Sequence, residues 1–343
     1  MQTTEASAAL DTLMNISLPR IARRSLVALA LLASLQAALP GASAQAAALG
    51  IYGGAGCDGA KHMQRFTDWL GRRPEAVLDF MTWSSLVEAS AWSMNCWTQA
   101  NVDQITYSLP MLPEDGSATL AQGAAGKFDD VFRNFARKLV QTGYPNAVIR
   151  IGWEFNGEWY AWAASKDPQA WIAYWRRIVD TMRAVPGAKF KFDWCPGNGW
   201  TNFRAEDAYP GDAYVDIIGM DVYNQSWNSN TVTPEQRWNE QVNQRHGLKW
   251  HAQFAAAHGK PISFPEWGTG IRSDGHGAGD DAQFIEGMAD WIATHDVAYH
   301  NYWDYNAPIF RGRISDNGQP QAAAAYRRSF SLRPQAPVLQ RVE

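Results

Sequence analysis

Eight short apolar segments, each bounded by turn residues, alternate with helix-like segments along the chain, and this alternation most constrains its fold. Short apolar runs of this kind are typical of buried parallel strands. The strand-like segments are residues 49–54, 76–83, 104–112, 147–155, 189–196, 215–224, 261–268 and 297–305. Eight strands separated by helices predict an α/β fold, a (β/α)8 TIM barrel formed by a single domain.

Three of the intervening segments have the apolar spacing of amphipathic helices. Residues 128–139, 171–182 and 284–292 carry apolar side chains at i, i+3, i+4 and i+7. Asp167 and Pro168 suit the N-cap and the first turn of the second helix. We interpret the three apolar stripes as faces that pack against the sheet.

The first 44 residues are organised like an export signal. RIARR (20–24) is positively charged, LVALALLASLQAAL (26–39) is apolar but short for a bilayer span, and Ala42 and Ala44 offer a cleavage site. We expect residues 1–44 to be a signal peptide and residues 45–343 to be a secreted or periplasmic catalytic domain. Met14 is an alternative start, and an uncleaved membrane anchor is the alternative to cleavage. No other long apolar run exists, so we expect no stable membrane insertion.

Charge and cysteine content restrict the partners. The net charge is −4 at pH 7 and no basic run occurs, which argues against nucleic acid. Neither the three cysteines nor the seven histidines have metal-ligand spacing, so we expect no metal or other cofactor. Cys57 and Cys96 follow the first and second strands, where neighbouring units would bring them together as a disulfide, with Cys195 free. We also expect a monomer.

Two loop segments resemble known binding sequences. GAGCDG (54–59) fits G-x-G-x-x-G, and Asp79 lies twenty residues beyond its last glycine, as in a dinucleotide fingerprint. An exported protein has little access to such cofactors, and eight strands exceed a six-stranded dinucleotide-binding sheet. We therefore interpret this segment as a loop after the first strand. SDGHGAGDD (273–281) is interpreted as a flexible loop, with calcium binding as the alternative.

Two glutamates end predicted strands, at the edge where barrel enzymes place their chemistry. Glu154 ends the fourth strand and Glu266 the seventh. Alternation of side chains places Arg150 below Glu154 on the inward face, where a cation can keep a carboxylate ionised, and Tyr223 on the inward face of the sixth strand. Such a pair suits glycoside hydrolysis, in which one carboxyl group protonates the leaving oxygen and the other attacks the anomeric carbon. Glu158 is the alternative acid, and a purely structural role for both glutamates is the alternative to catalysis.

Tryptophan is the compositional outlier, with 17 of 343 residues. Flat rings at strand ends can stack on the C–H faces of sugars, while polar neighbours bind the hydroxyl groups. The tryptophans at or beyond predicted strand ends are Trp83, Trp153, Trp159, Trp162, Trp194, Trp200, Trp227, Trp267 and Trp303.

RIGWEFNGEWYAW (150–162) resembles the acid/base segment of glycoside hydrolase family 26, a clan A family, which reads R-x-x-H-E-x-N-G-x-W-x-W. YPGDAYVDIIGMDVYN (209–224) resembles the Y-P-G-D-x-Y-V-D-x-x-G-x-D-x-Y-N of that family, and ISFPEWG (262–268) resembles its nucleophile strand. GIYGG (50–54) and YHNYWDYN (299–306) fit its first and last strands. The resemblance covers most of residues 49–306 and implies a retaining mechanism.

The same resemblance implies a role for each matching residue. Glu154 would be the acid/base and Glu266 the nucleophile, with Tyr223 bound to the nucleophile and Trp303 as the floor under the attacked sugar. The remaining residues expected to bind substrate are Arg150, Asn156, Trp159 and Trp162, which match family positions, and Trp153 and Trp267, which lie at strand ends.

One departure from the family pattern affects the substrate. Trp153 stands where the family has a histidine before the acid/base, and Pro265 precedes the nucleophile. The resemblance points to β-mannan or a mixed β-glucan, while Trp153 leaves room for a bacterial exopolysaccharide. We therefore expect an exported retaining endo-β-glycoside hydrolase that cleaves a β-linked polysaccharide or oligosaccharide by double displacement. The alternative is a non-catalytic carbohydrate-binding barrel.

Overall fold

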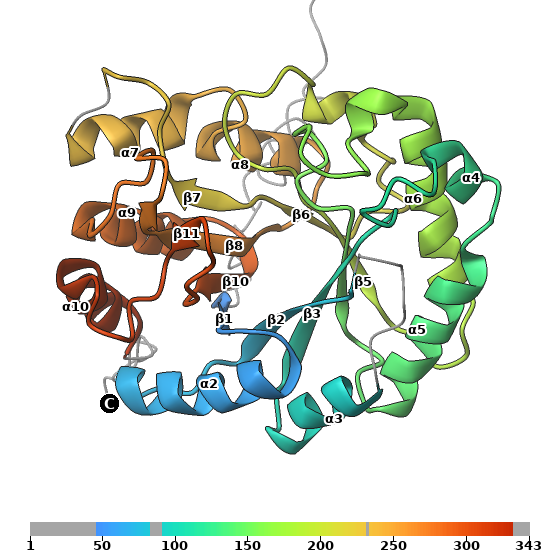
Figure 1. The fold of residues 1–343 in the computed structure, drawn as a ribbon, viewed down its shortest axis with the longest axis horizontal. Coiled ribbons are helices and arrows are strands. Elements are labelled where there is room, and N and C mark those ends of the chain that lie inside the picture. Colours follow the sequence, from blue (N-terminus) through green and yellow to red (C-terminus); the bar gives the residue numbers. More distant parts are fainter. Residues whose placement is uncertain (1–45, 83–90, 231–232, 332–343) are drawn as a thin grey trace, which may run out of the picture. The chain divides into compact units, whose positions relative to one another are not determined.

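The structure, a computed structural model, describes residues 46–82, 91–230 and 233–331. Its parallel strands follow the order β10-β1-β2-β3-β4-β5-β6-β8-β7, and pairing of β10 with β8 closes the barrel. Figure 1 shows the helices arranged around the strands. The predicted (β/α)8 barrel is confirmed. The signal segment and Trp83 lie outside the described residues.

The barrel strands overlap the eight predicted segments one to one, although several are shorter than predicted, except that residues 215–224 hold two strands. They are β1 (Ala48–Tyr52), β2 (Ala76–Phe80), β3 (Gln104–Leu109), β4 (Val148–Ile151), β5 (Lys191–Trp194), β6 (Ile217–Gly219), β7 (Val222–Asn224), β8 (Ile262–Thr269) and β10 (Val297–Trp303), with a separate hairpin of β9 (Ile271–Arg272) and β11 (Phe310–Arg311).

The helices fill the intervals between strands. They are α2 (Gly56–Leu70), α3 (Ala91–Gln99), α4 (Leu120–Ala124), α5 (Asp129–Gln141), α6 (Pro168–Arg183), α7 (Pro234–Asn243), α8 (Leu248–Ala257), α9 (Ala282–Thr294) and α10 (Pro320–Phe330), with short 3-10 turns η1 (Ala164–Lys166) and η2 (Ala205–Ala208). Among the residues that the structure describes, no helix is long and apolar enough to span a membrane.

The predicted strand at 215–224 is wrong as a continuous strand, because the chain changes partner in its middle. The Met220 N–H donates to Ser263 O at 3.1 Å on β8, whereas the next N–H, of Asp221, donates to Pro196 O at 3.2 Å after β5. This change of partner divides the segment into β6 and β7.

The predicted helical stripes pack where expected. Phe132, Phe135 and Leu139 of α5 are fully buried, as are several aromatic and aliphatic residues of α6. Burial of each such side chain stabilises the fold by about 1.5–3 kcal/mol. The Asp167 carboxylate accepts from the Ala170 N–H at 3.0 Å, so it caps α6 as predicted.

The glycines of GAGCDG make a tight turn into α2 rather than a dinucleotide site. Gly54 and Gly56 have φ of +126° and +53°, and a Cβ on Gly59 would lie 2.0 Å from Gly54 O. Asp79, at the end of β2, accepts from the Gly56 N–H at 3.1 Å and from Trp97 Nε1 at 2.6 Å. The carboxylate therefore binds the loop itself.

The predicted disulfide between Cys57 in α2 and Cys96 in α3 is confirmed. Their Cα atoms are 5.0 Å apart, and Cys195 is free and buried. The bond joins the helices that follow β1 and β2.

Removing this disulfide should lower the stability of the domain substantially. Cys57→Ser/Cys96→Ser is expected to reduce the free energy of unfolding by about 3–4 kcal/mol, because the bond closes a loop of roughly forty residues in the unfolded chain. Denaturant titration measures the change. Thiol counting in denaturant should find one thiol in the untreated protein and three after reduction. Three thiols without reduction, or equal stability of variant and wild type, would contradict the assignment.

Candidate active site

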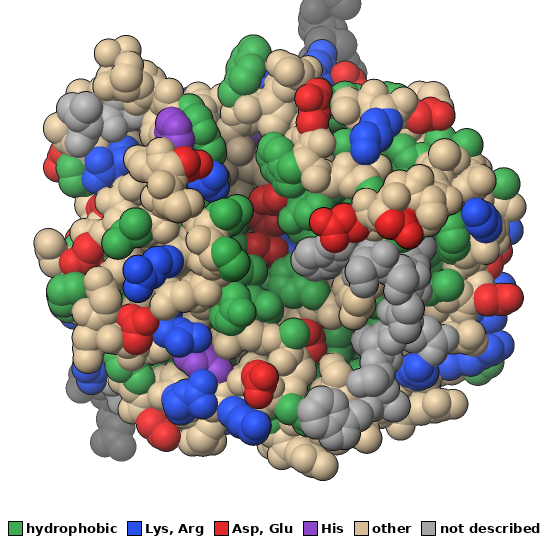
Figure 2. All heavy atoms as spheres, in the orientation of Figure 1, with side chains coloured by type: hydrophobic (Ala, Val, Ile, Leu, Met, Phe, Trp, Pro, Cys, Tyr) green, Lys and Arg blue, Asp and Glu red, His purple; other side chains and the backbone are tan. Residues whose placement is uncertain are grey.

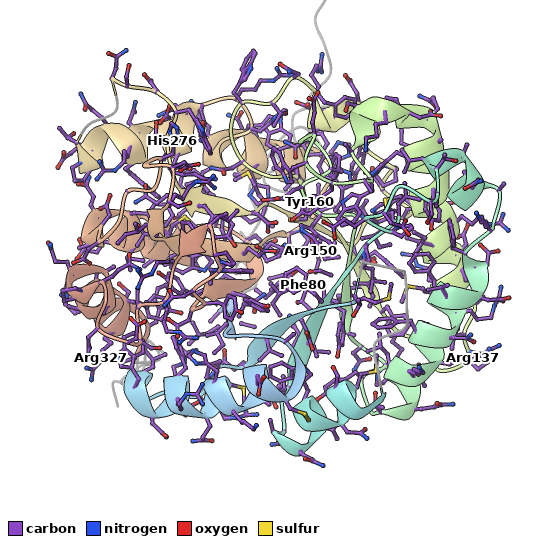
Figure 3. The ribbon with its side chains drawn as sticks, in the orientation of Figure 1. Phe80, Arg137, Arg150, Tyr160, His276 and Arg327 are labelled. Carbon is purple, nitrogen blue, oxygen red and sulfur yellow. A yellow bond between two sulfur atoms is a disulfide. The ribbon has the colours of Figure 1, made fainter. Side chains whose placement is uncertain are left out.

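The two predicted carboxylates lie in neighbouring cavities at the C-terminal ends of the barrel strands. Glu266 lines a cavity of about 400 Å³ and Glu154 lines one of about 550 Å³. Figure 2 shows a central hollow on this face, with acidic side chains at its bottom and hydrophobic side chains around it. In Figure 3, Phe80, Arg150 and Tyr160 lie together near the barrel centre. This end of the barrel is therefore the candidate active site.

Glu266 is held by a donor on each carboxylate oxygen. Arg150 Nη2 donates to Oε1, and the Tyr223 hydroxyl donates to Oε2 at 2.5 Å. Arg150 is fully buried; its Nη1 also donates to Asp221 Oδ1 at 2.6 Å and its Nε to Ser108 Oγ at 2.9 Å. Burial and the charge of Glu266 raise the pKa of Tyr223 well above its usual range, so Tyr223 remains a hydroxyl donor. The Glu266 anion is thus compensated and fixed in orientation.

Glu154 lies in a turn beyond the strand, and its predicted place within the strand is wrong. β4 ends at Ile151, and both Gly152 and Glu154 have left-handed backbones with φ of +56° and +50°. The Gly152 N–H still donates to Leu109 O at 2.8 Å, whereas the Glu154 N–H donates across to Cys195 O at 2.8 Å. The chain turns between these two bonds. Left-handed geometry in a non-glycine residue costs about 1–3 kcal/mol, which the surrounding hydrogen bonds must offset.

The surroundings of Glu154 favour its protonated form. Burial, followed by the neighbouring charge of Glu266, raises the pKa of Glu154 to about 7. The Trp159 Nε1–H donates to Glu154 Oε2 at 2.8 Å and opposes this rise, because it stabilises the carboxylate. Glu158 is exposed and lines neither cavity, so the geometry favours Glu154 as the acid.

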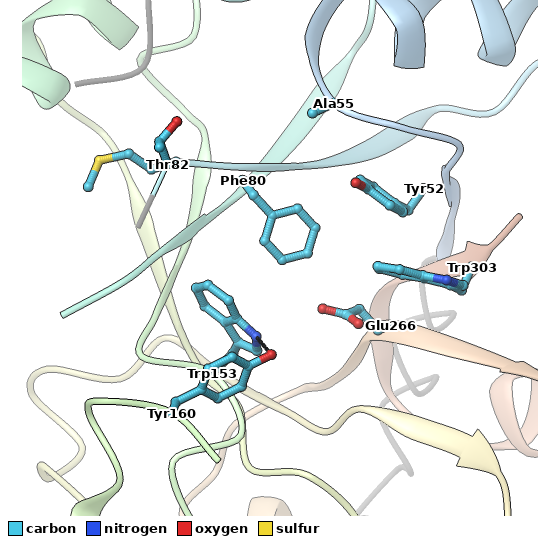
Figure 4. A pocket seen from close by; sticks show the side chains of 9 residues that line it. Tyr52, Ala55, Phe80, Thr82, Trp153, Tyr160, Glu266 and Trp303 are labelled. Atoms are coloured by element: carbon cyan, nitrogen blue, oxygen red, sulfur yellow. Dashed lines mark hydrogen bonds between the residues drawn. The ribbon is translucent and has the colours of Figure 1, made fainter. Parts of the chain in front are cut away.

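Aromatic side chains form most of the cavity at Glu266 (Figure 4). Trp303 stacks on Tyr52 with ring centroids 4.3 Å apart, and Phe80 meets Trp153 edge-on at 5.3 Å. Trp303 thus lines the cavity beside Glu266, where the sequence places the floor under the attacked sugar.

The cavity at Glu154 is lined by more polar side chains than the cavity at Glu266. Three of the predicted tryptophans line it with exposed rings: Trp159 is 60% exposed, Trp200 73% and Trp227 62%. Polar side chains share the same walls, namely Asn198, Thr201, Gln225, Ser226, Asn228, Glu240 and Gln244. Flat rings beside hydrogen-bonding groups suit several consecutive sugar units.

Arg150, Asn156 and Trp162 are buried and line neither cavity, and their expected contact with substrate stays a prediction. Asn156 donates to Gly197 O at 2.9 Å and accepts from the Gly197 N–H at 2.8 Å, which occupies both of its polar groups. Trp162 donates to Trp153 O at 2.9 Å. These three buried residues position the site from below.

Trp267 and Trp194 lie near the ends of β8 and β5, as expected, but they are buried and line neither cavity. Successive residues of a strand face opposite sides, so Trp267 must point out of the barrel because Glu266 points in. Trp267 donates to His300 Nδ1 at 3.1 Å and packs on Tyr326 of α10. Trp194 is fully buried against Phe254 of α8.

The sequence analysis missed Tyr52, Phe80 and Tyr160 as cavity residues. Tyr52 and Phe80 are the last residues of β1 and β2, so the strand-end rule that found Glu266 was sufficient to find them. Tyr160 lies in the loop after β4, and no strand periodicity indicates its direction.

The acidic segment 273–281 is engaged within the protein. Asp274 pairs with Arg272 at 2.7 Å, and Asp281 caps α9 and pairs with Arg237 at 3.0 Å. Within 46–82, 91–230 and 233–331, no three His, Cys, Asp or Glu side chains are grouped to hold a metal ion.

Replacing Arg150 should destabilise the whole barrel. Arg150→Met leaves the buried carboxylates of Asp221 and Glu266 without their cation, and is expected to cost about 3–5 kcal/mol of unfolding free energy. Arg177→Met is the control, because Arg177 pairs with Asp129 at a side chain that is 43% exposed; it should cost at most about 1 kcal/mol. Denaturant midpoints compare the two, and equal losses would refute the role given to Arg150.

Comparison with known proteins agrees with this geometry. A family model, Glycosyl hydrolase family 26, matches residues 88–266, just over half of the chain. The chain is 26% identical over 284 residues to Endoglucanase H of Acetivibrio thermocellus, covering 78% of this chain and 29% of that protein. It is 29% identical over 166 residues to a mannan endo-1,4-beta-mannosidase of Bifidobacterium adolescentis, covering 46% of this chain and 16% of that protein. The chain thus spans less than a third of either relative.

Solved structures share the fold. A modular endo-beta-1,4-mannanase from Cellulomonas fimi matches with a TM-score of 0.61 at 18% identity, over 82% of this chain and 71% of that chain. The YdhT protein from Bacillus subtilis matches with a TM-score of 0.58 at 17% identity, over 84% of this chain and 86% of that chain. Because the family model spans more than half of the chain, including both Glu154 and Glu266, the chain belongs to glycosyl hydrolase family 26.

Proposed function

We propose that this protein is an exported endo-β-glycoside hydrolase that cleaves a β-linked polysaccharide with retention of configuration. The observation that carries the proposal is the contrast between two neighbouring carboxyl groups. Glu266 is an anion clamped by Arg150 and Tyr223, whereas the pKa of Glu154 is raised to about 7. Retaining hydrolysis needs this division, a charged nucleophile beside a protonated acid.

In the first step Glu266 attacks the anomeric carbon and forms a glycosyl ester, while Glu154 gives its proton to the leaving oxygen. In the second step the Glu154 carboxylate takes a proton from water, whose oxygen attacks the same carbon and releases Glu266. When Glu266 becomes a neutral ester, Arg150 Nη1 still donates to Asp221 Oδ1 at 2.6 Å, so the buried guanidinium keeps a partner throughout.

The proposed substrate is a β-mannan, a mixed β-glucan or a bacterial exopolysaccharide. The named relatives are an endoglucanase and a mannan endo-1,4-beta-mannosidase, which support a glucan or a mannan, and Trp153 in place of the family histidine keeps an exopolysaccharide open. Endo action is supported by the two cavities, which offer walls for sugar units at both carboxylates. Release of reducing ends from carob galactomannan, barley β-glucan and the producing organism's own exopolysaccharide tests the proposal.

The proposed location is the periplasm or the exterior of the cell, and the proposed state is a monomer. The signal-like residues 1–44 support export. The Cys57–Cys96 disulfide also supports it, since such bonds persist in oxidising compartments.

The catalytic pair should respond differently to substitution. Glu154→Gln is expected to lower turnover of the polymer by about 10²–10⁴-fold, and least for aryl glycosides, whose good leaving groups need no acid. Glu266→Gln should abolish turnover of every substrate, because no glycosyl ester can form. Proton NMR of the first product should show the retained anomer. Glu158→Gln is the matched control and should resemble wild type; an inverted anomer, or an active Glu266→Gln variant, would overturn the mechanism.

The pH profile should report the protonation of Glu154. Its raised pKa means that the acid form dominates below pH 7, so kcat should fall as the pH rises through about 7. Trp159→Phe removes the N–H that stabilises the carboxylate, so the alkaline limb should move to higher pH. Trp200→Phe, in the same cavity, serves as the control and should leave the limb in place. A limb that does not move in Trp159→Phe would contradict this account.

A further inference from the structure

Tyr160 lies in the loop between β4 and η1 and lines the same cavity as Glu266. Its hydroxyl accepts a hydrogen bond from Trp153 Nε1 at 3.0 Å. Figure 4 shows this pair at the cavity wall, with the hydroxyl on the side toward Glu266. Burial, followed by the charges of Glu154 and Glu266, raises the pKa of Tyr160.

The direction of this hydrogen bond determines what Tyr160 can offer a ligand. An indole N–H is a donor and never an acceptor, so the Tyr160 oxygen must be the acceptor of the Trp153 bond. The hydrogen of the Tyr160 hydroxyl is therefore directed elsewhere. Burial, with the two nearby carboxylates, raises the pKa of Tyr160 far above its usual range, so this hydrogen is retained at working pH.

Packing holds the Tyr160 ring in place. The ring stacks on Trp162 with centroids 4.5 Å apart and planes within 9°. Trp162 in turn donates to Trp153 O at 2.9 Å, which closes a rigid unit of three aromatic side chains. Arg150 lies over the Trp153 ring at 5.4 Å, which ties this unit to the cation that clamps Glu266. A hydroxyl fixed in this way loses little entropy when it binds a ligand.

Trp153 occupies the position of the family histidine, yet its single polar atom is bound by Tyr160. The polar group that faces the sugar is then at residue 160 instead of residue 153. Apart from Tyr160, the side chains of this cavity that carry a hydroxyl or carboxyl group are Tyr52, Thr82 and Glu266. Its other described side chains are aromatic or apolar. A sugar held here meets apolar surface over most of its area and few hydrogen-bonding groups.

We propose that Tyr160 is the substrate-binding hydroxyl donor of the cavity that holds the attacked sugar, and that Trp153 is the residue that orients it. The pair selects a β-linked sugar unit that presents an oxygen acceptor to Tyr160 and a C–H face to the walls formed by Phe80 and Trp303. This assignment rests on the proposed glycoside hydrolase function, and it locates specificity in the loop after β4.

The proposal is tested by measuring kcat/KM for three variants, Tyr160→Phe, Trp153→Phe and the double variant. Carob galactomannan and barley β-glucan are the probes. Tyr160→Phe should lower kcat/KM about tenfold on the polymer that wild type cleaves, the usual loss for one hydrogen bond. Trp153→Phe should give a smaller loss in the same direction. The double variant should be no worse than Tyr160→Phe, because Trp153 acts through the hydroxyl that is already absent.

A matched control separates binding from folding. Tyr174→Phe removes a buried hydroxyl that donates to Met111 O at 2.8 Å, outside both cavities, so it should lower the melting temperature while leaving kcat/KM unchanged. Unchanged kcat/KM in Tyr160→Phe, or strictly additive losses in the double variant, would overturn this inference and leave the proposed function standing. A wild-type protein that cleaves neither these polymers nor the native exopolysaccharide would overturn both.

Discussion

The buried guanidinium of Arg150 is the interaction on which the rest of the site depends. It lies fully buried between Asp221 and Glu266 and also binds Ser108, so it joins side chains from β3, β4 and β8 and from the segment between β6 and β7. An unpaired charge at this depth costs several kcal/mol, so the two carboxylates and the cation require one another. The ion cluster therefore stabilises the barrel interior and presents Glu266, the proposed nucleophile, at its mouth.

The backbone geometry at Glu154 places a second carboxyl group where its protonated form is favoured. Its left-handed backbone follows the end of β4 and brings the side chain into a cavity shared with Trp159. There, burial and the charge of Glu266 raise its pKa to about 7. The two glutamates thus differ because Glu266 is paired with Arg150, whereas Glu154 is buried beside the charge of Glu266.

In the proposed function, the two cavities divide the work of binding the polymer. The one at Glu266 is lined mainly by aromatic rings, while the one at Glu154 combines exposed tryptophans with amide and hydroxyl groups. A cavity with few polar groups distinguishes between sugars through each hydrogen bond that it offers. A sugar that cannot form this bond leaves a buried polar group unpaired. A solvent-exposed platform instead tolerates variation along a polymer. This division fits tight recognition of one sugar unit and looser binding of its neighbours.

The sequence by itself determined the barrel, the strand that carries Glu266, the disulfide and the capped helix α6, because each depends on local periodicity or on the order of β/α units. The same period-two alternation that puts Glu266 inside was enough to place Trp267 outside. Tertiary structure alone decided the rest. The direction of Tyr160, the turn at Glu154 and the engagement of Asn156 with Gly197 depend on hydrogen bonds between segments distant in the chain or on loop packing, which carry no periodic signal. Only closure of the barrel brings Arg150 to Glu266, 116 residues further along the chain.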